Sequence, residues 1–310
     1  MLHHYPDPGI DSTPSDSRYW WRAWTQPELR VVVCANGIEV FLSSRDWRQG
    51  WQPVLLARQP IPCTAQQTGF WPEEVVWTTL AQILAHLPVF MQSQTRRSGL
   101  HVVVIVSNQF VRWLVAPWQG DVLRKSEREA YCLHLMQQHF GESMQDWQIS
   151  SQPARYGEHA LLNALPPGLV ARLQALFAEH GLSLGAIYPA WMLSANQALH
   201  GIRQQRLPES GWVICRESNG LTIACLQQGQ WLSINTLPLA SEPQWPSVVQ
   251  HSLLRAQVLY PERQLVNVLV AEADAPEVHE VLGEAFHVIG LSTHTRSGTE
   301  VRMPLRKRAA

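Results

Sequence analysis

The sequence is poor in lysine. Of the 24 lysine and arginine residues in the 310-residue chain, only two, Lys125 and Lys307, are lysines. Almost no ammonium group is therefore available to clamp a phosphate or to form a Schiff base. The formal net charge is −1, without the strongly basic balance that is typical of nucleic-acid binding. We expect no nucleic-acid partner.

Paired cysteines and long apolar runs are also missing. The five cysteines form no CxxC pair and lie mostly within apolar runs, as expected of reduced thiols in a reducing compartment. No stretch reaches the roughly 18 apolar residues of a membrane span, and the amino terminus lacks the pattern of a secretory signal. Cys132, His134 and His139 are close in sequence, but His134 points away from the helix face that the other two share. We expect a cytoplasmic protein without a metal site.

Tryptophan, in contrast, is abundant, with 14 residues. Residues 1–27 are rich in Pro, Asp and Ser and end in a cluster of aromatic side chains, which predicts an extended amino-terminal arm. Trp20, Trp21 and Trp24 of this arm are candidate partner-binding residues, because aromatic side chains dominate the energetics of interfaces. The alternative, that they attach the arm to the chain's own core, stays open.

Strand and helix patterns alternate from residue 28 onward, which predicts an α/β protein with mixed sheets covered by helices. Helices are expected at 72–88, 126–141, 166–181, 190–202, 247–260 and 276–286. The second of these is predicted to begin at Ser126, with Glu129 as its capping-box partner, and to end at Gly141.

One pattern occurs twice. Residues 31–42, VVVCANGIEVFL, and residues 212–226, WVICRESNGLTIACL, each contain an apolar strand ending in Cys, an Asn-Gly turn and a second apolar strand. We count the later turn as two residues longer. The repetition predicts two related lobes, 28–205 and 206–296, followed by a basic carboxy-terminal tail at 297–310.

Two lobes that each begin with a glycine-turn hairpin resemble the actin-like (ribonuclease H-like) fold. Within it, the chain is similar to the PilM-type proteins of type IV pili and to the cytoplasmic part of GspL-type proteins of type II secretion. Residues 106–118, VSNQFVRWLVAPW, resemble a strand–turn–strand motif of PilM-like proteins. The resemblance covers about residues 30–290. It implies a PilN-like inner-membrane partner, further pilus or secretion components, and a location at the inner face of the cytoplasmic membrane.

Active members of this fold carry Asp-x-Gly in the first turn and Asp-x-Gly-Gly-x-Thr in the second. The glycines let backbone N–H groups approach phosphate, and the aspartates organise Mg²⁺. Here Ala35 stands at the first Asp position, and the adenosine region, 270–274, has no glycine. The resemblance therefore implies a degenerate nucleotide site, without catalytic residues or bound cofactor, at Asn36, Gly37, Glu217, Asn219, Gly220 and Thr222.

Arg112, Trp113 and Trp118 are further candidate partner-binding residues. Arg112 is predicted to face opposite to Trp113 on a strand, where it would cap a carboxylate or stack on an aromatic ring. The sequence thus predicts a non-catalytic scaffold. Two alternatives stay open: an actin-fold ATPase or small-molecule kinase that uses ATP and Mg²⁺ with an atypical site, and a regulator whose arm occludes the cleft between the lobes.

Overall fold

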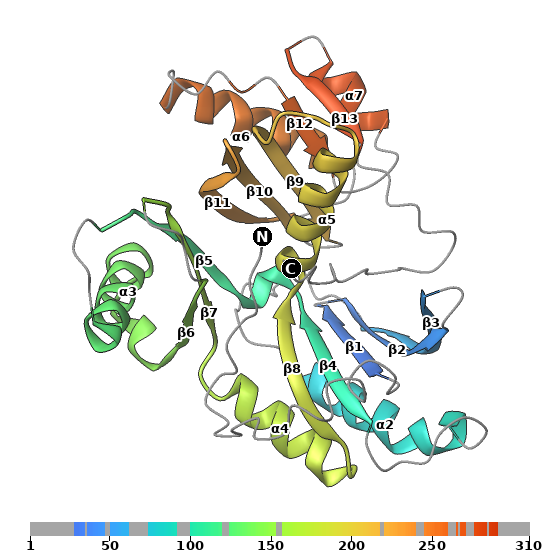
Figure 1. Cartoon of the computed structure of the whole chain (residues 1–310). Coiled ribbons are helices and arrows are strands. Elements are labelled where there is room, and N and C mark those ends of the chain that lie inside the picture. Colours follow the sequence, from blue (N-terminus) through green and yellow to red (C-terminus); the bar gives the residue numbers. More distant parts are fainter. Residues whose placement is uncertain are drawn as a thin grey trace, which may run out of the picture. The chain divides into compact units, whose positions relative to one another are not determined.

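The computed structural model describes residues 28–34, 36–46, 50–61, 74–91, 100–119, 124–152, 157–217, 220–239, 245–259, 265, 267–270, 276–283 and 285–290 (Figure 1). They form two compact units, the first from residues 28–110 and 168–190, the second from 111–167 and 191–290. Residues 111–167 thus belong to the second unit, whereas the sequence pattern predicts them in the first lobe. The predicted lobe boundaries stay a prediction, and the arm and the tail lie outside the described residues.

The first unit contains a five-stranded sheet with the order β3-β2-β1-β4-β8. The strands β1 (Glu28–Cys34), β2 (Gly37–Asp46) and β3 (Gly50–Pro60) form an antiparallel meander. The strands β4 (His101–Val106) and β8 (Ser183–Pro189) continue the sheet in parallel with β1. Valine and isoleucine dominate β1 and β4, and such β-branched side chains favour a pleated, buried sheet.

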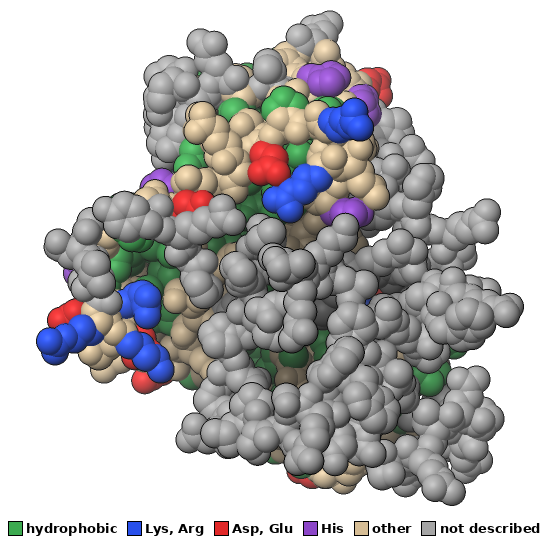
Figure 2. All heavy atoms as spheres, viewed as in Figure 1, with side chains coloured by type: hydrophobic (Ala, Val, Ile, Leu, Met, Phe, Trp, Pro, Cys, Tyr) green, Lys and Arg blue, Asp and Glu red, His purple; other side chains and the backbone are tan. Residues whose placement is uncertain are grey.

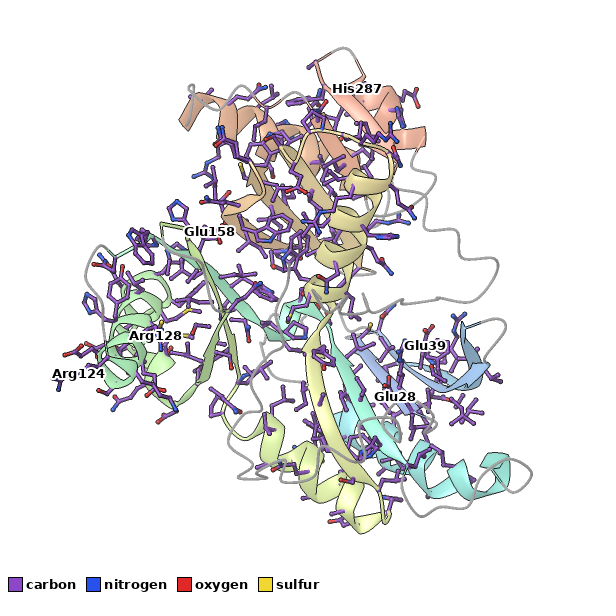
Figure 3. The ribbon with its side chains drawn as sticks, viewed as in Figure 1. Glu28, Glu39, Arg124, Arg128, Glu158 and His287 are labelled. Atoms are coloured by element: carbon purple, nitrogen blue, oxygen red, sulfur yellow. The ribbon has the colours of Figure 1, made fainter. Side chains whose placement is uncertain are left out.

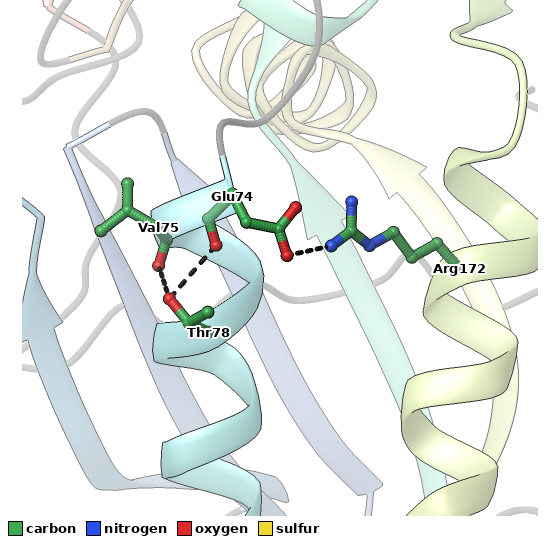
Figure 4. A network of polar contacts seen from close by, with 4 residues as sticks. All are labelled: Glu74, Val75, Thr78 and Arg172. Atoms are coloured by element: carbon green, nitrogen blue, oxygen red, sulfur yellow. Dashed lines mark hydrogen bonds and ion pairs between the residues drawn. The ribbon is translucent and has the colours of Figure 1, made fainter.

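The helices α2 (Glu74–Met91) and α4 (Leu169–Glu179) of the first unit lie beside each other (Figure 4). The Arg172 guanidinium of α4 donates a hydrogen bond to the Glu74 carboxylate and lies 4.5 Å from the centre of the Trp77 ring. The hydrogen bond from Arg172 holds the pKa of the Glu74 carboxyl below its usual value. Each helix buries an apolar stripe at helical spacing, made of Val76, Leu80, Leu84 and Leu87 in α2 and of Leu169, Leu173 and Phe177 in α4.

The second unit repeats this plan with a five-stranded sheet of the order β11-β10-β9-β12-β13. Its meander comprises β9 (Gly211–Glu217), β10 (Gly220–Gln227) and β11 (Gln230–Pro238). The strands β12 (Asn267–Val270) and β13 (His287–Gly290) are parallel to β9. The predicted repetition is therefore present in the strand order of both sheets. The predicted difference in turn length is wrong, because Cys34 opposes Gly37 and Glu217 opposes Gly220, at the same spacing.

Helices cover both faces of the second sheet. On one face, α6 (Trp245–Leu259) and α7 (Pro276–Leu282) bury a core with side chains such as Trp212, Ile214 and Leu221. On the other, α5 (Ala190–Gln204) is held by a hydrogen bond from the Cys215 thiol to the Ser194 hydroxyl, 3.0 Å long. The predicted mixed α/β fold class is confirmed.

A third, smaller sheet is inserted into the chain between β4 and α4. It has the order β5-β7-β6, from β5 (Arg112–Ala116), β6 (Gln148–Ser151) and β7 (Ala160–Leu165), and is packed against α3 (Lys125–Phe140). We call residues 111–165 the inserted sheet. In the second half of the chain, α7 alone connects β12 to β13 among the described residues. The two halves thus differ by this insertion, and its strand β7 was not predicted.

The start of α3 corrects one expectation. The helix begins at Lys125, and the carboxylate of Glu127, not that of Glu129, accepts a hydrogen bond from the Arg124 backbone N–H at 2.7 Å. Glu129 instead lies 3.9 Å from the Lys125 ammonium. The predicted end is confirmed, because Gly141 follows the helix with a φ of 94°, a conformation that favours glycine.

Candidate functional site

The first hairpin turn contains two of the predicted nucleotide-site residues. Asn36 is partly exposed, and its carbonyl accepts a hydrogen bond from the Ile61 N–H at 2.7 Å. A Cβ atom on Gly37 would lie 3.1 Å from the Gln59 carbonyl oxygen, so this glycine allows β3 to approach β2 closely. The close approach of β3 gives Gly37 a role in the sheet that requires no phosphate. The sequence offers no carboxylate between Cys34 and Gly37.

The second hairpin brings three other predicted residues together on one face of its sheet. Glu217 opposes Gly220 across the β9–β10 pair, and Thr222 opposes Cys215. Directly opposed residues project to the same face of a sheet, and their faces alternate along each strand. Glu217, Gly220 and Thr222 therefore share the face on which Cys215 contacts α5. Asn219 lies outside the described residues, as do residues 271–274 of the adenosine region.

The Thr222 hydroxyl is turned into the sheet. Thr222 is only 1% exposed, and its hydroxyl lies 3.3 Å from the hydroxyl of Thr236 on β11. This cross-strand pair satisfies the hydrogen bonding of a buried polar group. The Thr222 hydroxyl therefore has a hydrogen-bond partner within its own sheet that requires no nucleotide. The neighbouring Arg216 projects to the opposite face, where its guanidinium lies 5.1 Å from the centre of the Trp245 ring.

The inserted sheet carries the candidate partner-binding residues Arg112 and Trp113 on opposite faces of β5. The Arg112 guanidinium lies 5.1 Å from the centre of the Phe140 ring of α3, which is one of the two contacts that the sequence predicted for it. Burial lowers the pKa of Arg112 to about 10, so the side chain stays charged at neutral pH. Trp113 is buried, with 4% of its surface exposed, whereas Trp118 just beyond β5 is 39% exposed. Of these three, Trp118 offers the most accessible surface.

Charged side chains gather at the amino-terminal end of α3 (Figures 2 and 3). Arg124, Lys125 and Arg128 are exposed there, together with Glu127 and Glu129. Cations at this end of a helix oppose its dipole, so they do not stabilise α3 through that effect. The inserted sheet therefore combines an exposed tryptophan, a stacked arginine and a helix end of mixed charge.

The described part of the chain contains no candidate metal site and no candidate membrane-spanning helix. No group of three or more His, Cys, Asp or Glu side chains is arranged there to hold a metal ion. Cys132 is buried on α3, whereas His134 and His139 are exposed on the same helix. Within the described ranges, every helix is too short or too polar to cross a bilayer. The predicted residues Trp20, Trp21 and Trp24 lie outside these ranges.

Comparisons with known proteins rest on structure. No protein-family model matches the sequence, and no curated protein is similar to it. A chain of the PilM–PilN type IV pilus biogenesis complex matches with a TM-score of 0.56 and 16% identity, over 84% of this chain and 90% of that one. A Bacteroides thetaiotaomicron protein with an actin-like ATPase fold and unknown function matches with a TM-score of 0.50 and 10% identity, over 87% and 93%.

The fold is actin-like. This confirms the fold that the two glycine-turn hairpins predicted. The cytoplasmic domain of EpsL, an inner-membrane component of the type II secretion system of Vibrio cholerae, matches with a TM-score of 0.46 and 13% identity, over 79% and 82%. Identities this low establish the actin-like fold alone, since one fold hosts many functions.

Two features of this actin-like chain were not predicted from its sequence. One is β7, whose Asn163 is buried at the centre of the inserted sheet. The other is the exposure of Val54 and Leu55 on the edge strand β3, at 51% and 46%. Pro53 and Pro60, at either end of that stretch, are the signal that could have identified an edge strand, because proline is tolerated there and not in a central strand.

Proposed function

We propose that this chain is a non-catalytic scaffold at the inner face of the cytoplasmic membrane, in a type IV pilus or related secretion platform. It binds a short cytoplasmic segment of a PilN-like membrane partner. The observation that carries the proposal is an actin-like fold, kept in both five-stranded sheets, whose Thr222 hydroxyl is engaged by Thr236 and whose first turn has Ala35 in place of a carboxylate. The PilM–PilN complex supports the choice of partner.

The inserted sheet is the part of the chain best suited to bind that partner. The first half of the chain contains this element between β4 and α4, and the second half has no equivalent between β12 and α7 among the described residues. The inserted sheet is therefore not needed to complete either five-stranded sheet. Trp118 supplies exposed aromatic surface, and the Arg112 guanidinium of β5 stacks on the Phe140 ring of α3. Tryptophan and arginine are the side chains most often responsible for binding energy at interfaces.

Binding to the partner is tested with the full chain and fluorescent peptides that match the cytoplasmic segments of the platform proteins encoded beside it. We expect one peptide to bind, and Trp118→Ala to weaken its binding at least about tenfold, as expected at a central aromatic contact. Arg112→Ala should also weaken it. Arg216→Ala is the matched control, because Arg216 stacks on Trp245 at the same 5.1 Å distance outside the inserted sheet. If none of the peptides binds, the proposal fails.

An enzymatic function is the second candidate, and Glu217 is the observation that favours it. Its carboxylate shares a sheet face with Gly220 and Thr222, as an atypical nucleotide site would require. Calorimetry at millimolar Mg-ATP separates the two functions: the scaffold gives no heat of binding. An ATPase or kinase gives heat that Glu217→Ala abolishes, with Glu209→Ala, at the other end of the hairpin pair, as the control.

A further inference from the structure

The amino-terminal end of α3 projects from the inserted sheet (Figure 3). Residues 124–130 are all exposed, whereas Cys132 and Met136, further along the helix, are buried against the sheet. Packing therefore does not fix the side chains at this end. Arg124 and Arg128 also oppose the helix dipole there, so they have no stabilising role in α3 through that effect.

The carboxylates at this helix end are engaged within α3 itself. Glu127 accepts the Arg124 backbone N–H at 2.7 Å, and Glu129 lies 3.9 Å from the Lys125 ammonium. Among the described residues, no carboxylate forms an ion pair with the guanidinium of Arg124 or of Arg128. A guanidinium matches the two oxygens of a carboxylate with a planar fork of donors. These two arginines can therefore bind a carboxylate of another molecule without breaking a pair.

The two arginines lie on one flank of α3, beside an exposed aromatic side chain. The Arg128 backbone N–H donates a hydrogen bond to the Arg124 carbonyl at 2.9 Å, so the two residues are one turn apart. Tyr131 follows on the same flank, and its hydroxyl accepts a hydrogen bond from the Gln119 side chain at 2.5 Å. Gln119 adjoins Trp118, which is 39% exposed. We call Arg124, Arg128, Tyr131 and Trp118 the arginine flank.

The spacing of the arginine flank suits an extended segment. Four residues of a helix rise about 6 Å, which separates Arg124 from Arg128 along the axis. Alternate residues of an extended chain project to the same side about 6.6 Å apart. Asp or Glu at alternate positions can therefore pair with both arginines. The next position on that side lies toward Tyr131 and Trp118, where an apolar side chain would pack.

An anionic membrane surface is the other occupant that arginine and tryptophan could attract. A membrane is broad, however, so its headgroups would also face Glu127 and Glu129, which are exposed at the same helix end. Like charges brought together in this way repel each other. A single segment that lies along one flank avoids most of this repulsion. The mixed charge of the helix end thus favours a peptide over a membrane.

We infer that the arginine flank binds an extended acidic segment. Carboxylates at alternate positions pair with Arg124 and Arg128, and a bulky apolar side chain of the segment packs on Trp118. The inference rests on the proposed function, because the segment belongs to the PilN-like membrane partner. It adds the chemistry by which that segment is recognised.

The test uses the full chain and the platform peptide that binds to it, beside a version of that peptide with Asn and Gln in place of Asp and Glu. We expect the neutral peptide to bind at least about tenfold more weakly, and the double variant Arg124→Glu, Arg128→Glu to lose as much affinity for the original peptide. A peptide with Lys at the acidic positions should recover binding to this double variant, which a misfolded protein would not show. Arg255→Glu, at an exposed arginine of α6, is the matched control and should leave the affinity unchanged.

The outcomes separate this inference from the proposed function. Equal binding of the acidic and the neutral peptide would overturn the inference and leave the scaffold proposal standing. Binding of phosphatidylglycerol vesicles that the double variant loses, without any difference between the peptides, would assign the arginine flank to the membrane. If none of the platform peptides binds, the proposed function fails, and the inference fails with it.

Discussion

Gly211, the first residue of β9, lies close to the backbone of Asn267 in β12. A Cβ atom at this position would be 2.8 Å from the Asn267 carbonyl oxygen, and backbone cannot move aside as a flexible side chain does. We expect Gly211→Ala to lower the free energy of unfolding by about 1–3 kcal/mol, the usual cost of overpacking. Denaturant unfolding measures this cost.

The matched control is Gly185→Ala in β8. There the nearest atom to an added Cβ, the Val102 carbonyl oxygen, is 3.4 Å away, an ordinary contact. This variant should stay within about 0.5 kcal/mol of the unvaried protein. A larger loss at Gly185 than at Gly211 would contradict the strand spacing described here.

At the scale of single residues, the sequence predicts a role for Gly37 and Thr222 in a nucleotide site, because glycine and threonine occur in phosphate-binding turns. The structure gives each a neighbour within its own sheet. The Gln59 carbonyl oxygen lies 3.1 Å from the point that a Cβ atom on Gly37 would occupy, and the Thr236 hydroxyl lies 3.3 Å from that of Thr222. A cross-strand neighbour more than ten residues away in the chain leaves no mark on a local motif, so it could not be foreseen.

The first turn of α3 offers a test of helix capping. Glu127 accepts the Arg124 N–H, whereas Glu129 makes only an exposed ion pair with Lys125. We expect Glu127→Ala to destabilise the protein by about 0.5–1 kcal/mol, the cost of losing a cap. Glu129→Ala should cost less than about 0.5 kcal/mol, as is usual for an exposed pair. Thermal unfolding of both variants measures the two losses of stability. A larger loss for Glu129→Ala than for Glu127→Ala would support Glu129, the capping partner predicted from the sequence.

Strand β7 shows where sequence patterns fail for a whole element. Its residues, Ala160–Leu165, are mostly alanine and leucine, which favour helices and include no β-branched side chain. They form a strand because β5 and β6 pair with it on either side and bury its Asn163. The valine-rich strands β1 and β4, in contrast, were predicted, since their own composition already favours a buried sheet.

The cysteines report on both units of the molecule. Cys34, in the first unit, is half-buried, whereas Cys132, Cys215 and Cys225, in the second, are buried, and none of these four is in a disulfide. Burial raises the pKa of the Cys132 thiol, so it stays protonated at pH values where an exposed thiol ionises. Among these four, we expect iodoacetamide to modify Cys34 before the three buried thiols between about pH 7 and pH 9, with Cys132 unmodified until denaturant opens its unit.

The sign of the pH effect follows from the same pKa. Above the ordinary pKa of a thiol, the unfolded chain ionises at Cys132 while the folded chain does not, so stability decreases as pH rises through that range. Mass spectrometry of the labelled peptides follows each cysteine separately. Labelling of Cys132 as fast as that of Cys34 in the native protein would disprove the burial described here.

For the molecule as a whole, the repetition of two hairpins predicted an actin-like fold. It could do so because each hairpin is visible locally in the sequence as two apolar strands joined by an Asn-Gly turn. The inserted sheet was not foreseen as a separate element, since its strands are short and one of them has a helical composition. Arg112 opposes Ala164 in its β5–β7 pair, so the two ends of the insertion lie about 5 Å apart. The polypeptide thus leaves and re-enters at neighbouring points, and evolution could enlarge, trim or exchange this module without lengthening the path on either side of it.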